Sequence, residues 1–568
     1  MKILLLLLSF AVFQLSYAQN VGIGTIAPQA KLHIKGSADV SQLIIDANTT
    51  QSNTQPFIRL RNAAGIDLLH LHSDDTSNIF LGLNAGQANT AGSGLGMYNT
   101  FIGTRAGASN TTGYRNTANG YQALFSNTSG NYNSAYGYYA LKYNTTGTYN
   151  TANGTNALYN NTTGTYNTAN GALALYYNTT GNYNMANGAY ALFNNTTGGY
   201  NTANGNFALN YNTTGTNNTA NGYQSLQANT SGYSNTAIGY QSLFSNTTGV
   251  YNTAHGVSAL YNNTTGYYNT AHGVSALYNN TTGNYNTANG VSALFSNTTG
   301  NDNTANGSLA LNSNTYGASN TANGNQALYA NTSGNYNTAN GYNALSFNTS
   351  GYSNTADGYN SLQSNTTGYN NTALGSGADV TGGIVNATVI GANAIVNASN
   401  KVRIGNTSVT VIEGQVAFSF PSDQRFKYNI QNNVPGLSFI TQLKPVTYYF
   451  DAEKMDEFTR TGKLDNTVRA AAYHPEQALH TGFLAQDVEK LANELGYEFD
   501  GVHAPANNKD HYSLAYSQFV VPLVKGMQEQ EEIIEAQNRK INKQDDQIKM
   551  LTKKIEALAK MVELLAKK

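Results

Sequence analysis

The chain lacks cysteine and tryptophan, and only 10% of its 568 residues are charged, against about 25% in an ordinary globular protein. Without cysteine, disulfides, thiol catalysis, cysteine-ligated zinc and an N-terminal lipoprotein anchor are excluded. The net charge of −1 leaves no basic surface for nucleic acid. Glycine (56 residues), tyrosine (41 residues) and asparagine are abundant instead. The composition therefore indicates a patterned chain rather than an average enzyme.

Residues 1–18 have the pattern of a signal peptide. Lys2 supplies a positive charge, residues 4–13 are apolar, and Ala18 ends a small-x-small cleavage site. A membrane anchor would need roughly 20 apolar residues, and no later stretch of the sequence is apolar enough. We therefore expect cleavage after Ala18 and a protein that is secreted or lies on the outer surface of a bacterium, with no transmembrane anchor.

Residues 19–98 form an N-terminal region that we expect to be rich in β-structure. Short alternations of apolar and polar residues predict strands at 31–34 and 57–60. The pair His70 and His72 is followed by two aspartates and has the residue types of a metal site. Because no third spaced ligand is evident, we interpret this segment as a surface loop, and we expect neither a metal nor a cofactor.

From Asn99 to Gly375 the sequence repeats every 17 residues, with the unit N-T-A-x-G-x-x-A-L-x-x-N-T-T-G-x-Y. The fifth position is glycine in all 17 copies, and the twelfth and fifteenth are asparagine and glycine in all 16 complete copies. The ninth is leucine in 15 consecutive copies. Invariant glycine indicates backbone with a positive φ or a close approach, and asparagine is the next best residue at such corners.

This repeat predicts a β-solenoid or β-roll over residues 99–375, with one coil per repeat. Glycine, asparagine and threonine dominate, and each disfavours the interior of a helix. One leucine and two alanines are too few to close a core within one coil, so successive coils must stack to bury a continuous apolar ladder. A coil this thin could also need neighbouring chains to complete its core.

The expected surface of the shaft is neutral and aromatic. Its charged residues are Arg105, Arg115, Lys142, Asp302 and Asp357. Tyrosine precedes the repeat start in ten copies, and stacking of the coils predicts that these tyrosines form a ladder. The many N-x-T triplets match a glycosylation sequon, but repetition of an Asn-Thr-Thr-Gly corner accounts for them.

Residues 376–420 change character and contain short β-like runs at 389–394 and 401–406. This segment resembles the head repeats of trimeric autotransporter adhesins, in which short strands wind as a left-handed β-roll around a threefold axis. The resemblance implies a β-roll-like neck between the shaft and the domain that follows.

Residues 421–525 have an ordinary composition, with a helix-like stretch at 436–443 and a predicted strand at 445–450. Three motifs follow one another in this domain: Ser422–Ile430, Gly482–Glu489 and Tyr512–Tyr516. Together they resemble the intramolecular chaperone domain of endosialidases and other phage tail fibres, which also ends some bacterial surface proteins. The resemblance implies a domain that trimerises, assists folding of the β-rich fibre before it, and can cut itself off.

The same resemblance implies the residues of the cut. The family uses a serine and a lysine five residues later, which correspond here to Ser422 and Lys427, and the cut bond would be Pro421–Ser422. A serine hydroxyl is activated when a neighbouring base takes its proton, and a lysine can be that base where burial lowers its pKa. The residue types alone also allow an ordinary cap with solvated cations.

The tail, residues 526–568, continues a heptad pattern that starts just before it. The a positions are all apolar: Val520, Met527, Ile534, Ile541, Ile548, Ile555 and Val562. Seven such heptads predict a coiled coil of roughly 70 Å. Isoleucine at a with leucine at d by itself favours two strands. Three successive glutamines at d weaken that rule, and the family resemblance favours three chains.

We predict a mainly β protein, with a repetitive β-solenoid/β-roll shaft, then a small α+β domain and a C-terminal trimeric coiled coil. Its expected function is that of a secreted homotrimeric fibre or adhesin that contacts a host surface, a glycan or a matrix. Its C-terminal domain would drive trimerisation and shaft folding, with self-cleavage at Pro421–Ser422 as the only enzymatic step. The alternative is an ice-binding or glycan-binding solenoid with a permanent, non-cleaving trimerisation domain.

Overall fold

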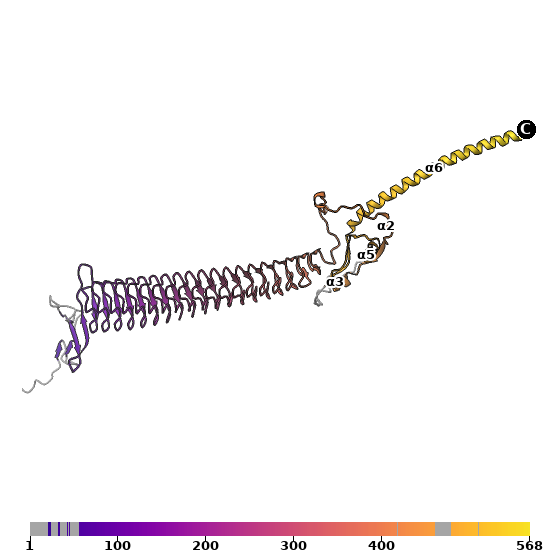
Figure 1. Cartoon of the computed structure of the whole chain (residues 1–568). Coiled ribbons are helices and arrows are strands. Elements are labelled where there is room, and N and C mark those ends of the chain that lie inside the picture. The colour runs from indigo at the N-terminus through magenta and orange to yellow at the C-terminus, as the bar shows by residue number, and fades with distance from the viewer. Residues whose placement is uncertain are drawn as a thin grey trace, which may run out of the picture. The chain divides into compact units, whose positions relative to one another are not determined.

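A computed structural model describes residues 21–23, 32–34, 43, 45, 56–416, 418–459, 479–508 and 510–567. The predicted signal peptide, residues 1–18, lies outside the described residues. The chain divides into two compact units, Met1–Tyr251 and Asn252–Lys568. Both contain stacked turns of the predicted β-solenoid, about 19 in all (Figure 1).

The first unit begins with a parallel pair, β1 (Val21–Ile23) and β2 (Leu32–Ile34), at the position of the predicted strand 31–34. An antiparallel hairpin of β3 (Ile58–Arg61) and β4 (Asp67–His72) then leads into β5 (Ile79–Leu81). Nine parallel strands follow, one per turn: β6 (Thr100–Ile102), β7 (Thr117–Asn119), β8 (Ser134–Tyr136), β9 (Thr151–Asn153), β10 (Thr168–Asn170), β11 (Met185–Asn187), β12 (Thr202–Asn204), β13 (Thr219–Asn221) and β14 (Thr236–Ile238).

The second unit continues the same pattern. Its stacked strands are β15 (Thr253–His255), β16 (Thr270–His272), β17 (Thr287–Asn289), β18 (Thr304–Asn306), β19 (Thr321–Asn323), β20 (Thr338–Asn340), β21 (Thr355–Asp357), β22 (Thr372–Leu374), β24 (Thr388–Ile390) and β26 (Val402–Ile404). A second short ladder joins β23 (Asp379–Val380) to β25 (Ile395–Val396). Thr372 pairs with Thr388, and Thr388 pairs with Val402. The neck therefore continues the solenoid with shorter turns.

Four residues of each turn have a positive φ. In the turn that starts at Asn150, Gly154 has a φ of 145°, Asn156 of 57°, Leu158 of 51° and Tyr166 of 57°. The glycine at the fifth position is confirmed as a residue that needs positive φ. The leucine was not expected to adopt this conformation, which is unfavourable for an aliphatic side chain. It is completely buried, so burial of its side chain compensates for the backbone cost.

The glycine at the fifteenth position is explained by a close approach instead. The carbonyl of Gly147 accepts hydrogen bonds from the side-chain amides of Asn133 (2.9 Å) and Asn144 (3.0 Å). A Cβ on Gly147 would collide with the side chain of Asn144 and with the carbonyl of Gly164 in the next turn. Side chains at this position would therefore break the stacking of the turns.

Buried asparagines form ladders along the shaft. Asn161 Nδ2 donates to Asn144 Oδ1 at 2.7 Å, and Asn144 Nδ2 donates to Asn127 Oδ1 at 2.8 Å. All three side chains are fully buried. A buried amide is tolerated when its donors and acceptors are satisfied. The ladders thus form a polar half of the core.

The apolar half of the core consists of alanine at the third and eighth positions and leucine at the ninth. In the turn that starts at Asn150, Ala152, Ala157 and Leu158 have no exposed surface in the single chain. The predicted apolar ladder is thus confirmed. Each turn covers its neighbour within one chain, so this apolar core is closed without a neighbouring chain.

The first repeat fills the same space differently. Phe101 replaces the alanine at the third position, and Gly107 replaces the leucine at the ninth. A Cβ on Gly107 would lie 2.6 Å from the Phe101 ring. The large residue and the glycine therefore compensate each other in volume. The Phe101 ring stacks on Phe80, with centroids 5.3 Å apart, and His72 lies next to Phe80.

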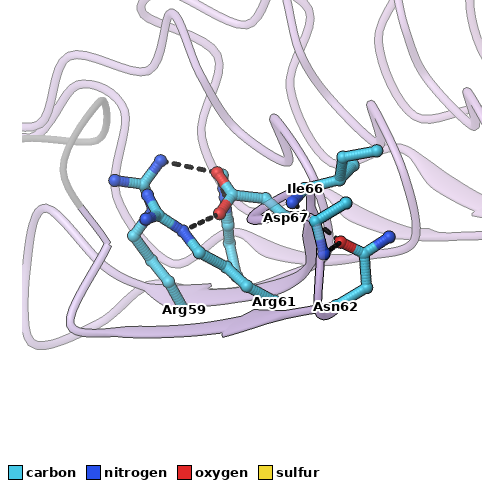
Figure 2. Close-up of polar contacts among 7 residues, drawn as sticks. Arg59, Arg61, Asn62, Ile66 and Asp67 are labelled. Carbon is cyan, nitrogen blue, oxygen red and sulfur yellow. Dashed lines mark hydrogen bonds and ion pairs between the residues drawn. The ribbon is translucent and has the colours of Figure 1, made fainter.

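The hairpin β3–β4 covers the N-terminal edge of the solenoid sheet of the first unit. Figure 2 shows both arginines of β3 reaching the carboxylate of Asp67, which lies 2.5 Å from Arg59 Nη2 and 2.7 Å from Arg61 Nε. These hydrogen bonds hold the pKa of Asp67 well below its ordinary value. The turn is closed by Asn62, whose side-chain oxygen accepts the backbone N–H of Ala64 and Ile66. An edge covered in this way is protected from pairing with another chain.

The C-terminal region contains short helices and strands around an aromatic core. Its elements are η1 (Gln424–Phe426), α2 (Leu437–Ile440), β27 (Val446–Tyr449), α3 (Ala452–Thr459), β28 (Leu479–Gly482), α5 (Ala485–Glu494), β29 (Val502–His503), β30 (Ser513–Leu514), η2 (Tyr516–Phe519) and α6 (Val520–Ala566). The pairs β27–β28 and β29–β30 are antiparallel. The core is formed by Phe439, Val488, Ala492, Phe499 and Phe519.

The helix α2 is shorter than the predicted stretch 436–443, and β27 falls within the predicted strand 445–450. Leu437 N donates to Glu529 Oε2 at 2.8 Å, so a side chain of α6 caps the start of α2. Every helix in the described ranges is too short or too polar to cross a bilayer.

Candidate functional site

Ser422 and Lys427, the two residues singled out from the sequence, are in direct contact. Lys427 Nζ donates a hydrogen bond to Ser422 Oγ, with a distance of 2.7 Å between the two atoms. Both side chains are exposed in the single chain. The spacing of five residues therefore brings the hydroxyl and the amine together, in the arrangement that a serine nucleophile and a lysine base require.

The local fold explains this contact. The 3-10 helix η1 lies between the two residues, and Asp423 caps its start by accepting the backbone N–H of Arg425 at 2.9 Å. Lys427 follows the helix, and its own N–H bonds back to the carbonyl of Gln424 at 3.1 Å. One tight turn thus reverses the chain between Ser422 and Lys427. The ordinary cap that the residue types allowed is therefore present as well, and Asp423 makes it.

Asp423 and Arg425 form an ion pair beside the dyad. Arg425 Nη2 lies 2.6 Å and Arg425 Nε 2.9 Å from Asp423 Oδ2. The hydrogen bonds from Arg425 hold the pKa of Asp423 below its ordinary value. The aspartate is therefore ionised at neutral pH, and its carboxylate is bonded to Arg425. The hydroxyl of Ser422 is bonded to Lys427 instead.

The other two motifs of the domain lie against each other. The hydroxyl of Tyr516 accepts a hydrogen bond from Phe483 N at 3.0 Å. The hydroxyl of Tyr512 donates to Glu489 Oε2 at 2.8 Å. Segments about thirty residues apart are thus fastened by tyrosines, which explains why these residues occur together in one sequence pattern.

A buried carboxylate connects the neck to this domain, and the sequence did not point to it. The side chain of Asp510 is fully buried and lies 3.0 Å from Lys401 Nζ and 2.7 Å from His503 Nε2. Burial raises the pKa of Asp510, but the hydrogen bonds from Lys401 and His503 outweigh it and hold that pKa well below its ordinary value. Lys401 immediately precedes β26, so the pair joins the last stacked turn to the segment before β30.

The apolar stripe of α6 is exposed over most of its length. Ile541 is 54% exposed, Ile548 59% and Ile555 63%. In this helix Pro522 and Gly526, close to its start, are buried. Isolated apolar side chains on a surface are ordinary, but a continuous stripe of this length indicates an interaction face.

The histidine pair of the N-terminal region lies on β4. His70 Nε2 lies 3.1 Å from Asp67 Oδ2. His72 is almost completely buried, so the expectation that it lies in a surface loop is wrong. Burial lowers the pKa of the His72 imidazole to about 4. In the part of the chain that the structure describes, no group of three or more histidine or carboxylate side chains is placed to hold a metal ion.

Residues 422–497 match the family described as chaperone of endosialidase. Among curated proteins, none matches this chain. The family match begins at Ser422 and includes the dyad, α2, β27 and α5. The C-terminal region of this chain is therefore a chaperone-of-endosialidase domain, which stands behind a long β-solenoid shaft.

Proposed function

We propose that this protein is a secreted homotrimeric fibre whose C-terminal domain aligns three chains, assists folding of the shaft, and then cuts the bond between Pro421 and Ser422. The observation that carries the cleavage step is the 2.7 Å contact between Ser422 Oγ and Lys427 Nζ. The family match, which starts at this serine, supports the same assignment.

The chemistry of the cut uses atoms that are already close together. The neutral amine of Lys427 takes the hydroxyl proton as Ser422 Oγ attacks the carbonyl carbon of Pro421. The C–N bond breaks, the proton passes to the Ser422 nitrogen, and an ester joins Pro421 to Ser422 Oγ. Water then hydrolyses the ester, which leaves a carboxylate on Pro421 and a free amine on Ser422.

Assembly would have to precede this step. A lysine becomes a general base where burial favours its neutral form, and Lys427 is exposed in the single chain. We therefore infer that partner chains cover the dyad in the trimer. Cleavage would then occur only after assembly, because Lys427 is exposed to solvent in an isolated chain.

The exposed stripe of α6 supports association of three chains through this helix. Its heptads continue over seven repeats, and the a-position side chains from Met527 to Val562 are 40–72% exposed in the single chain. A parallel bundle of α6 helices would bury them. The same bundle would hold the three C-terminal domains in one register.

Folding of the shaft would benefit from a fixed end. A solenoid grows by adding turns to an existing edge, and the first turn is the least stable because it has only one neighbour. The contact between Lys401 and Asp510 holds the last stacked turn against the C-terminal domain. A folded domain can thus supply the first edge on which the preceding repeats stack.

The decisive experiment is intact mass and gel analysis of the purified full chain. We expect the wild-type chain to release a fragment that starts at Ser422, and we expect Ser422→Ala and Lys427→Ala to stay whole. Ser419→Ala, a serine three residues before the dyad, is the matched control and should be cut normally. Cleavage of the Lys427→Ala chain at the wild-type rate would contradict the dyad.

A third outcome would distinguish a self-cleaving domain from a permanent trimerisation domain. If every chain stays whole but sediments as a trimer, the C-terminal domain is a permanent clamp and the protein has no enzymatic step. Sedimentation of the uncut Ser422→Ala chain tests this directly, because that variant keeps α6 and should still be trimeric under the proposal.

A further inference from the structure

A groove of about 1190 Å³ runs along the shaft of the first unit, over the turns between Ser126 and Thr230. Two columns of side chains form it, from the eleventh and thirteenth positions of successive repeats. The thirteenth position is threonine in each of these turns from Thr145 to Thr230. The eleventh position alternates in the centre of the groove: Tyr143, Asn160, Tyr177, Asn194 and Tyr211.

Two tyrosines of the groove, Tyr143 and Tyr177, are turned differently from their neighbours in the next column. In the neighbouring column, Tyr159 and Tyr176 stack with an interplanar angle of 4°, so their planes lie across the direction in which the turns stack. Tyr143 stands at 89° to Tyr159, and Tyr177 stands at 86° to Tyr176. The ring planes of Tyr143 and Tyr177 are therefore parallel to the stacking direction, and the two side chains are 41% and 44% exposed.

These rings are held in place before any ligand arrives. Tyr177 lies edge-on to both Tyr176 and Phe193, with centroid distances of 4.7 and 5.1 Å. Edge-to-face packing of this kind fixes a ring more firmly than solvent exposure alone would allow. When a ligand stacks on such a ring, little side-chain conformational entropy is lost.

The floor of the groove is rigid and uncharged. The Thr162 hydroxyl donates to the carbonyl of Thr179 at 3.0 Å, and the Thr179 hydroxyl donates to that of Thr196 at 3.0 Å. The residues that line the groove include no acid and no base. One cation lies at its edge: Lys142 Nζ is 5.0 Å from the centroid of the Tyr143 ring. A neutral ligand with hydroxyl groups and flat apolar faces fits these walls better than an ion or a charged polymer.

We propose that this groove binds an extended, neutral polysaccharide of the β-1,4-linked type, with Tyr143, Tyr177 and Tyr211 as stacking platforms. Neighbouring turns lie about 4.8 Å apart, so platforms two turns apart recur about every 9.6 Å. This repeat is close to the length of two sugar rings in an extended chain. Every second sugar would then meet a tyrosine face, and the asparagines between the platforms offer amide groups to its hydroxyls.

The test is isothermal titration calorimetry of the uncleaved Ser422→Ala full chain with cellohexaose, chitohexaose and xylohexaose. Maltohexaose, which is curved, and hexagalacturonate, which is charged, are the comparison ligands. We expect binding of at least one extended neutral oligosaccharide and weaker binding of its disaccharide. Binding should fall at least about tenfold when Tyr143, Tyr177 and Tyr211 are all changed to Ala.

The shaft offers a matched control on its other tyrosine column. Tyr149, Tyr166 and Tyr183 are exposed to a similar degree, but their rings stack on one another. Changing these three to Ala should leave the affinity within about twofold, and changing the groove tyrosines to Phe should preserve most of it. Equal loss from both alanine sets would overturn the proposal, because binding would then be a general property of the tyrosine surface.

Two further results would also overturn it. One is the absence of binding to all three extended oligosaccharides by a chain whose circular dichroism shows a folded shaft. The other is preferential binding of the charged ligand. Thermal hysteresis of ice growth without any glycan binding would assign the groove to water instead. None of these results bears on cleavage at Ser422, which is measured separately by mass.

Discussion

The shaft and the helix α6 differ in how far their apolar side chains are buried. In the shaft, Leu158 and its counterparts are completely buried within one chain. In α6, Ile541 and Ile548 are more than half exposed. The contrast teaches that the shaft closes its core within one chain, whereas the tail leaves an apolar face open for the association that we propose. Trimerisation is therefore a property to be tested in the tail and not in the repeats.

The largest effect should come from a charge in the apolar stripe of α6. The double variant Ile541→Asp/Ile548→Asp should weaken trimer association at least about 1000-fold, because each charge would have to be buried in the bundle. Sedimentation velocity measures the loss. Lys553→Asp, on the opposite face of the helix, is the control and should remain trimeric. A variant that stays trimeric would show that the domain before α6 is sufficient for association.

The next prediction concerns a buried asparagine of the shaft. Asn178 is fully buried; it donates to Asn161 Oδ1 and to the carbonyl of Gly181, and it accepts from Asn195 Nδ2. Asn178→Ala leaves these groups unsatisfied and should cost about 3 kcal/mol of local stability. Hydrogen exchange of the flanking turns measures it. Thr180→Ala, an exposed change in the same turn, should have almost no effect, and trimerisation should be unchanged in both.

A smaller effect is expected where the first repeat departs from the others. Gly107→Leu restores the usual residue but drives it into the Phe101 ring, which should cost about 2 kcal/mol. Adding Phe101→Ala converts the turn to the common pattern and should recover most of the loss. A double-mutant cycle followed by urea unfolding gives the coupling. Additive losses would show that the two positions do not compensate each other.

The smallest expected effect is a pH dependence of stability at the N-terminal end of the shaft, caused by His72. Burial lowers the pKa of His72 from 6.5 to about 4. Between these values the unfolded chain binds a proton that the folded chain excludes, so the stability of this end falls as the pH drops from 6.5 towards 4 and is unaffected above 6.5. Hydrogen exchange in β4 and β5 at pH 7 and pH 4.5 measures the change.

His72→Leu should abolish that pH dependence. His255→Asn provides the control, because it restores the residue that most repeats carry at this position. The pH response of β4 and β5 should be the same in that variant as in the wild-type chain. A response that persists in His72→Leu would assign it to the carboxylates of the hairpin.

Much of the shaft could be predicted because the repeats allow positions to be compared within one chain. The period, the stacking, the apolar ladder and the tyrosine ladder all follow from it; Tyr149 and Tyr166 indeed stack, with centroids 4.7 Å apart. The left-handed leucine could not be predicted, because side-chain hydrophobicity says nothing about φ. Position-specific burial decides that conformation.

The asparagine ladders were missed although a signal for them exists. The twelfth position was interpreted as a corner, yet a corner accepts glycine, aspartate or serine as well. Only asparagine occurs there, and an amide column needs a donor and an acceptor on every side chain. Strict asparagine, rather than a mixture of turn residues, is the pattern that indicates a buried ladder.

At the candidate site, the resemblance gave the residues and the structure gave the reason for their spacing. A 3-10 turn of three residues makes positions 422 and 427 neighbours. The link between Lys401 and Asp510 lies outside any sequence pattern, because it joins residues 109 positions apart through a charge that is common in any chain. Such contacts depend on how the last stacked turn packs against the C-terminal domain, which the sequence does not specify.

The equivalence of successive turns has a consequence for how such a gene can change. Recombination between two repeats removes or inserts whole units, and the new neighbours meet through the same hydrogen bonds and the same Ala-Leu contacts as the old ones. Each event alters the reach of the shaft by a fixed step of about 4.8 Å per repeat. Length is thus heritable variation that costs no stability, and selection can adjust it without changing the C-terminal region.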